Sequence, residues 1–151
     1  MNDAVMLSIR PEWAKKILSG EKKVEVRKSF PGNVYLPFKV YMYETVHSDG
    51  PDKGCGAVVG EFTCDEIFDI VWTSTGHKYD YQRGEDCLSV FQLHDYLGAG
   101  DGYGWHITKP VTYDSPVPVT DFIHVCSGNG YIGERKPFAR CPQSWMYCEE
   151  R

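Results

Sequence analysis

The first part of the chain changes from one hydrophobic period to another. Residues 5–9 alternate weakly between apolar and polar, which predicts a short strand. Over residues 11–18 the apolar positions follow a helical spacing, with Trp13 and Ile17 four residues apart. Gly20 follows where a left-handed residue commonly ends a helix. We therefore expect a strand, a short helix and a sharp turn in this order.

After that turn the pattern repeats every two residues. Val24 and Val26 would face one side of a strand, while Glu25 and Arg27 would face the other. Lys22 stands where the turn passes into the strand, so its side chain can reach the same space as Glu25 and Arg27. The pattern predicts a strand with one apolar and one charged face.

The remaining patterns predict a β-rich chain with one further helix. We expect strands over residues 36–45, 56–72 with a bend at Gly60, two runs within 102–125 separated by prolines, and a last strand in the tail. Residues 73–86 are polar and predict a long loop, and residues 86–98 predict a helix with Asp86 as its N-cap. The order β-α-β-β-β-α-β-β indicates an α+β fold with a curled, mostly antiparallel sheet and helices at its ends. Without repeats or linkers, residues 1–151 are expected to form a single domain.

Composition and charge narrow the possible partners. The chain has 151 residues and a formal net charge of −5, which argues against a protein that covers long duplexes with positive charge. Residues 10–28, from Arg10 onward, nevertheless carry a local balance of +4. A basic patch on an acidic chain suits a compact anionic ligand. We expect a cytoplasmic protein, because neither a signal peptide nor an apolar run long enough to span a membrane is visible.

The cysteines and histidines do not predict a metal site. The six cysteines form no CxxC pair, and the spacing of His124, Cys126, Cys141 and Cys148 lacks the paired ligands that are typical of structural zinc. We expect reduced thiols, no metal and no other cofactor.

The charged face with Lys22, Glu25 and Arg27 is open to two interpretations. It could be a solvated strand face whose ion pairs add little to stability. Alternatively, two cations beside a carboxylate can hold a phosphate and hydrogen-bond a base or a ribose. The same three groups could act in acid–base chemistry if burial shifted the pKa of Lys22 or Glu25 toward neutrality.

The sequence from Leu7 to Pro31 resembles the opening of ASCH domains, a family with the PUA-like fold. The family signature Gly-x-Lys-x-x-Glu-x-Arg is matched by Gly20, Lys22, Glu25 and Arg27, and it follows a short helix as it does in the family. "VVGEFTCDEI" and "YGWHI" further along are similar to later strands of the family. The resemblance implies a small, mostly antiparallel β-barrel flanked by short helices, with a basic cleft that binds RNA or a nucleotide.

Some members of the family are hydrolases that act on RNA or on acylated cytidine nucleosides. The nucleoside amidohydrolases use the motif Lys, a Thr two residues before the motif Arg, and a more distant Glu. Here that Thr is replaced by Glu25, and a carboxylate does not serve as the same acyl-transfer nucleophile. Lys22 with Glu25, Glu61 or Glu66 keeps a hydrolase as the alternative prediction.

Three further side chains are candidates for ligand contacts. Trp105 and His106 are neighbours on a predicted strand, so they point to opposite faces and one of them could line a cleft. Tyr79, near Tyr81 and Arg83 in the predicted loop, could stack on a base. A structural role is an equally good interpretation of each.

Overall fold

The computed structural model describes residues 3–47, 50–51, 53–126 and 133–151. Strands dominate this part of the chain, together with two short α-helices and one 3₁₀ turn. The elements in chain order are β1 (Asp3–Ile9), α1 (Pro11–Leu18), β2 (Val24–Arg27), β3 (Phe38–Glu44), β4 (Ala57–Thr73), β5 (Gly76–Tyr79), α2 (Val90–Leu97), β6 (Gly102–Val117), η1 (Val119–Asp121), β7 (Ile123–Val125), β8 (Arg135–Pro137) and β9 (Trp145–Glu149). The α+β class, the first helix and the last strand agree with the sequence prediction.

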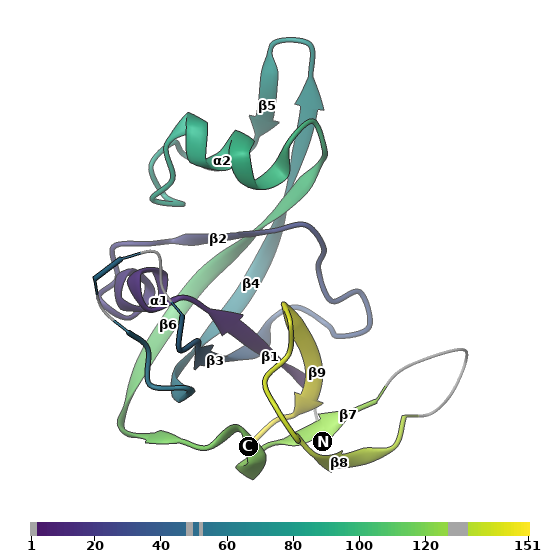
Figure 1. Cartoon of the computed structure of the whole chain (residues 1–151). Helices are drawn as coiled ribbons and strands as arrows, with labels where there is room; N and C mark the ends of the chain where they lie inside the picture. The colour runs from purple at the N-terminus through teal and green to yellow at the C-terminus, as the bar shows by residue number, and fades with distance from the viewer. Residues whose placement is uncertain (1–2, 48–49, 52, 127–132) are drawn as a thin grey trace.

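The strands of the described residues form one open, mixed sheet. Its order is β2-β6-β4-β3-β1-β9-β7-β8, with β5 added beside β4. β1 and β3 run parallel and the other neighbours run antiparallel, as expected for a mostly antiparallel sheet. Figure 1 shows β4 and β6 running the length of the molecule, with β5 and α2 at one end and β7 and β8 at the other.

The prediction of a barrel was wrong, because the sheet does not close. Closure would require a ladder between β2 and the strands around β1, and the sheet contains none there. The connection is instead made by a side chain: Arg27 on β2 donates from Nη2 to the backbone oxygen of Ser8 on β1 at 2.9 Å. The gap between β1 and β2 is therefore spanned by the Arg27 side chain, and a cavity lies in this gap.

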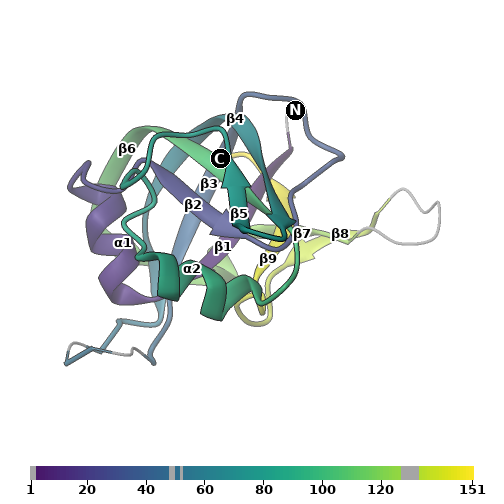
Figure 2. The same ribbon diagram turned by 90° about the horizontal axis from the view of Figure 1, so that it is seen from above.

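Helix α1 begins and ends where the sequence predicts. Pro11 occupies its first turn, where a missing N–H is tolerated, and Ala14 and Ile17 are fully buried against the sheet. After the helix, Gly20 has φ of +82°, a conformation that a residue with a Cβ rarely adopts. In both views α1 and α2 lie on the same side of the molecule, near β2 (Figures 1 and 2).

The two strand runs expected within residues 102–125 are largely one continuous strand, β6, which crosses Pro110 and Pro116. Both prolines are exposed, and both lie where the pairing with β4 is interrupted. The register jumps from Thr63↔Thr108 to Glu61↔Val111, and again from Thr112 to Val117. Because proline cannot donate to a ladder, it is tolerated at such irregular positions.

The region after β4 also differs from the sequence prediction. The expected loop over residues 73–86 contains β5, which returns as a hairpin against β4. The second helix starts later than expected, with Ser89 and not Asp86 as its N-cap. Ser89 accepts from the backbone of Gln92 while the Gln92 side chain accepts from Ser89, so both ends of a capping box are satisfied. Asp86 is instead buried beneath Tyr81, which donates to its carboxylate at 2.7 Å.

The apolar side chains form three packed groups on the two sides of the sheet. The first lies under α1 and contains Trp105, the second lies beneath η1 and contains Tyr41, and the third joins β2 to α2. No helix in the described ranges is both long and apolar enough to cross a membrane. All six cysteines fall within the described part of the chain, and they are free thiols.

Candidate ligand-binding cleft

The turn between α1 and β2 brings Lys22 into the interior. Its backbone N–H donates to the carbonyl of Lys16 at 2.9 Å, which fixes the chain as it leaves the helix. The side chain is only 1% exposed; its Nζ donates to the backbone oxygen of Asp86 and lies 3.6 Å from Oε1 of Glu25. A lysine is rarely buried so completely unless its charge is paired. The predicted proximity of Lys22 to the charged face of β2 is confirmed.

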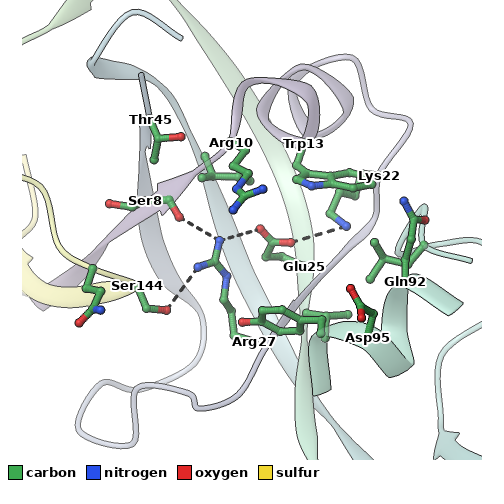
Figure 3. Close-up of a pocket in the computed structure, with 15 residues that line it drawn as sticks. Ser8, Arg10, Trp13, Lys22, Glu25, Arg27, Thr45, Gln92, Asp95 and Ser144 are labelled. Carbon is green, nitrogen blue, oxygen red and sulfur yellow. Dashed lines mark hydrogen bonds and ion pairs between the residues drawn. The ribbon is translucent and has the colours of Figure 1, made fainter. Parts of the chain in front are cut away.

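Arg27 holds the other oxygen of the same carboxylate. Its Nη2 lies 3.2 Å from Oε2 of Glu25 and also donates to the Ser8 carbonyl, while Nη1 donates to Oγ of Ser144 at 3.3 Å. Figure 3 shows Lys22, Glu25 and Arg27 in a row, with the carboxylate in the middle. Each charged group in the row has a partner, so the arrangement is rigid before any ligand arrives.

This row forms the floor of a cavity of about 610 Å³. One wall comes from β1 and the start of α1, and the opposite wall comes from α2, with Gln92 and Asp95 (Figure 3). Tyr96 of α2 also lines the cavity. The residues that line the cavity are Ser8, Ile9, Arg10, Trp13, Lys22, Glu25, Val26, Arg27, Thr45, Leu88, Gln92, Asp95, Tyr96, Gln143 and Ser144. Elements far apart in the sequence therefore meet at one polar site.

The lining combines positive charge with two aromatic rings. Its ionisable groups include three cations (Arg10, Lys22 and Arg27) and two carboxylates (Glu25 and Asp95), an excess of one positive charge. This balance suits a ligand with one or two negative charges, because a more anionic ligand would meet the carboxylates.

Both aromatic rings are already in contact with cations. The Nζ of Lys22 lies 5.0 Å from the centre of the Trp13 ring, and that of Lys16 lies 5.4 Å from it. Lys28 lies 5.1 Å from the ring of Tyr96. Burial is the main cause that raises the pKa of the Tyr96 phenol above its ordinary value, so this group is protonated at neutral pH, as an exposed tyrosine also is. Trp13 and Tyr96 are thus held in place as walls of the cavity.

The other predicted ligand contacts lie elsewhere. Trp105 is fully buried in the core, where its ring packs edge-on against Phe38. His106 points to the opposite face, as expected for its neighbour on a strand, and its Nδ1 lies 2.6 Å from Asp65. The structure therefore brings neither residue to the cavity.

Tyr79 is also outside the cavity lining. Its ring stacks on Tyr81 at 4.5 Å, and its hydroxyl accepts from Arg83 at 3.1 Å. These contacts connect β5 to the segment that follows it. They give Tyr79 and Arg83 a structural role in the free protein.

The carboxylates proposed for a hydrolase are also placed apart from Lys22. Glu61 pairs with Lys39 at 2.9 Å and accepts from Tyr113 at 2.8 Å, in a polar group beside the second core cluster. Glu66 is exposed and does not line the cavity. Of the candidate carboxylates, Glu25 is therefore the one that the fold brings to Lys22 and Arg27.

Several cavity residues were not expected from the sequence. Ser8 and Ser144 meet Arg27 from β1 and from the segment before β9. The α2 residues that line the cavity lie more than sixty positions after Arg27 in the sequence. The Ser-x-x-Gln capping box at residues 89–92 was a readable sign of where α2 begins. No local pattern indicated that this helix faces β2.

Comparison with known proteins gives a structural match. No family model matches the sequence, and no curated protein matches it either. The solved ASCH structure from Zymomonas mobilis aligns with a TM-score of 0.64 at 22% identity, over 95% of this chain and 86% of that chain. A serine-to-alanine variant of that protein aligns with a TM-score of 0.64 at 20% identity, over 95% of this chain and 87% of that one. A tyrosine-to-phenylalanine variant aligns with a TM-score of 0.58 at 24% identity, over 77% and 76%.

The chain has the ASCH fold. The resemblance inferred from Gly20, Lys22, Glu25 and Arg27 is thus matched by the arrangement of the chain in space. At these identities the similarity concerns the fold, so the chemistry of the cleft has to be argued from its own residues.

Proposed function

We propose that this protein is an ASCH-domain protein that binds RNA or a nucleotide in the cleft above Lys22, Glu25 and Arg27, and that it acts in the cytoplasm. The observation that carries the proposal is the buried row of two cations around one carboxylate, which opens into a polar cavity of about 610 Å³. Burying such a row is costly for a protein that gains only stability from it. A function in ligand binding gives a physical reason for such a row to line a cleft.

The size of the cavity favours one nucleotide unit. Pockets for small ligands typically measure roughly 300–1,000 Å³, a range that includes this cavity. A base that is turned out of a single strand, with its ribose and phosphate, has the required mixture of planar, polar and anionic surface. The excess of one positive charge supports contact with one phosphate and does not support tracking along a polymer.

A direct test compares two exposed arginines. Arg10 lines the cavity, whereas Arg140 is exposed elsewhere, so Arg10→Ala and Arg140→Ala remove the same charge from different places. Binding is measured by fluorescence anisotropy with short single-stranded RNAs and by calorimetry with the four nucleoside 5′-monophosphates. We expect Arg10→Ala to weaken binding about tenfold and Arg140→Ala to change it less than twofold.

Two results would count against the proposal: no binding of any RNA or nucleotide by the wild-type protein, or equal binding by both variants. The number of phosphate contacts is checked by repeating the titration at several salt concentrations. A slope that corresponds to about one or two phosphates is expected.

No observation in the cleft favours the hydrolase alternative. The Glu25 carboxylate lies between Lys22 and Arg27, and the position of the family's Thr nucleophile is taken by this same residue. Chromatography of the binding mixtures, with acylated cytidines added to the panel, would detect turnover directly.

A further inference from the structure

The open edge of β2 has a main-chain donor and acceptor for which the described residues supply no partner. In an antiparallel pair, alternate residues direct their N–H and C=O groups toward the partner strand or away from it. Ile107 on β6 donates to the carbonyl of Lys23 at 2.8 Å, so this carbonyl points inward, toward β6. Glu25 and Arg27 share this orientation, so Val24 and Val26 direct their main-chain groups to the outer edge.

The chain after β5 covers this outer edge on both sides of Val26. The outward N–H of Val24 donates to the carbonyl of Glu85 at 3.0 Å, as the alternation requires, and the same carbonyl also accepts from the N–H of Lys23, just before the strand, at 2.7 Å. One residue beyond the strand, the backbone of Lys28 faces the phenol of Tyr96 and lowers the pKa that burial raises. Val26 lies between these two contacts. Within the described residues, no partner is found for its outward N–H or C=O.

The position of Val26 makes these free groups notable. Its side chain is 5% exposed and packs with Leu93 and Leu97 of α2, yet the residue lines the cavity. Because valine has no polar side-chain atom, any polar contribution of Val26 to the cavity comes from its backbone. Buried main-chain N–H and C=O groups are nearly always hydrogen-bonded. An N–H and a C=O without a partner at a cavity wall therefore indicate a ligand that bonds to both.

We infer that the outward N–H and C=O of Val26 are the recognition edge for a nucleobase, an inference that rests on the nucleotide-binding function proposed above. The two groups come from one extended residue and point the same way, so together they match an adjacent acceptor and donor on a planar ring. The Watson–Crick edge of each common base carries such a pair. The row formed by Lys22, Glu25 and Arg27 then lies beside the bound nucleotide and supplies the charge.

An added peptide strand does not fit the same edge. Strand addition uses main-chain groups at every second residue along several positions. Here the N–H of Val24 is bonded to Glu85 and the backbone of Lys28 faces Tyr96, one on each side of Val26. An uncovered stretch this short suits a compact planar ligand.

The inference is tested by amide hydrogen exchange, followed by NMR on ¹⁵N-labelled protein. The probes are the four nucleoside 5′-monophosphates, 3-methyluridine 5′-monophosphate, whose blocked N3 lacks the donor, and ribose 5-phosphate, which lacks a base. The amide of Val24 is the matched control, because it is already bonded to Glu85.

At saturation with the tightest-binding monophosphate we expect the Val26 amide to exchange at least about tenfold more slowly, with little change at Val24. Ribose 5-phosphate should leave the Val26 amide unchanged. Uridine 5′-monophosphate should bind about tenfold more tightly than its 3-methyl derivative.

A second measurement uses Val26→Pro, which removes the N–H at an edge position where proline is tolerated, with Val26→Ala as the control for the lost side-chain packing. Val26→Pro should bind about tenfold more weakly than Val26→Ala.

The outcomes separate the two proposals. If nucleotides bind and depend on Arg10 while the Val26 amide exchanges as before, the recognition edge is refuted and the proposed function stands. If neither nucleotides nor RNA bind, the proposed function fails and the inference fails with it. Should Val26→Pro not fold, exchange in the wild-type protein still decides the question.

Discussion

The Nζ of Lys22 lies 3.6 Å from Oε1 of Glu25, and the two side chains are only 1% and 7% exposed. The ion pair is therefore removed from solvent and is held by the turn after α1 on one side and by β2 on the other. Its environment makes it both a structural element and the floor of the cleft. The consequences for stability can be measured without knowledge of the ligand.

Replacing Lys22 by Met should destabilise the protein by about 3 kcal/mol, because Glu25 loses one of the two cations that offset the cost of its burial. Urea unfolding measures the change. Lys136→Met, at an exposed position on β8, should change stability by no more than about 0.5 kcal/mol. The double variant Lys22→Met/Glu25→Gln should regain part of the loss. Equal stability of Lys22→Met and Lys136→Met would contradict this account of the cleft floor.

Gly60 should not tolerate a side chain. A Cβ at this position would come within 2.4 Å of the carbonyl oxygen of Val111 on β6, where the two longest strands bend around each other. Because that neighbour is backbone, we expect Gly60→Ala to cost about 1–3 kcal/mol, measured by thermal or urea unfolding. Gly32 has open space around the same position, so Gly32→Ala is the control and should be close to neutral.

The capping box of α2 should contribute measurably to stability. Ser89→Ala removes the acceptor for the Gln92 backbone, and we expect a loss of about 1 kcal/mol in urea unfolding. Because Gln92 lines the cavity, ligand binding should weaken as well. Ser74→Ala, at an exposed position beside β5, provides the comparison. If both variants behave like the wild type, the cap does not position this wall.

Tyr41 should make stability depend on pH in the alkaline range. Burial raises the pKa of Tyr41 to about 12, partly offset by the backbone N–H of Arg151, which donates to its hydroxyl. The folded state therefore keeps a proton that the unfolded state releases near pH 10. The stabilisation linked to this proton is complete below pH 10 and is lost as the pH rises toward 12.

The measurement is urea unfolding at intervals between pH 9 and 12. Tyr41→Phe should show a shallower decline than the wild type across this window, because the titrating group is gone. Tyr35, which is 95% exposed, is the control, and Tyr35→Phe should retain the wild-type slope. A decline that is identical in all three proteins would show that Tyr41 titrates equally in both states.

Sequence patterns were most informative where structure is local. The helical spacing of Trp13 and Ile17 and the stop at Gly20 predicted α1, because caps and apolar periodicity act within one turn. The alternation of Val24 and Val26 with Glu25 and Arg27 predicted the two faces of β2. The prolines of β6 led to the wrong prediction of two separate strands. A proline interrupts a strand only where its N–H would have to bond to the partner strand, and the pairing with β4 is irregular at these positions.

Trp105 illustrates the same limit within the site. The prediction that Trp105 and His106 point to opposite faces was correct, but the alternation along a strand does not say which face of the sheet is covered. Packing against Phe38 places the Trp105 ring in the core. Tyr79 likewise found its partners, Tyr81 and Arg83, only after β5 had folded back on β4.

The sequence by itself determined the strand-helix-strand order of the first thirty residues and the placement of Lys22, Glu25 and Arg27 on a common face. These depend on backbone propensity and side-chain direction, which are properties of neighbouring residues. The tertiary structure alone decided that the sheet stays open, that Ser8 bonds Arg27 and α2 lines the same cavity, and that the outward main-chain groups of Val26 have no partner among the described residues. Those features depend on contacts between segments far apart in the chain, which have no local pattern to reveal them.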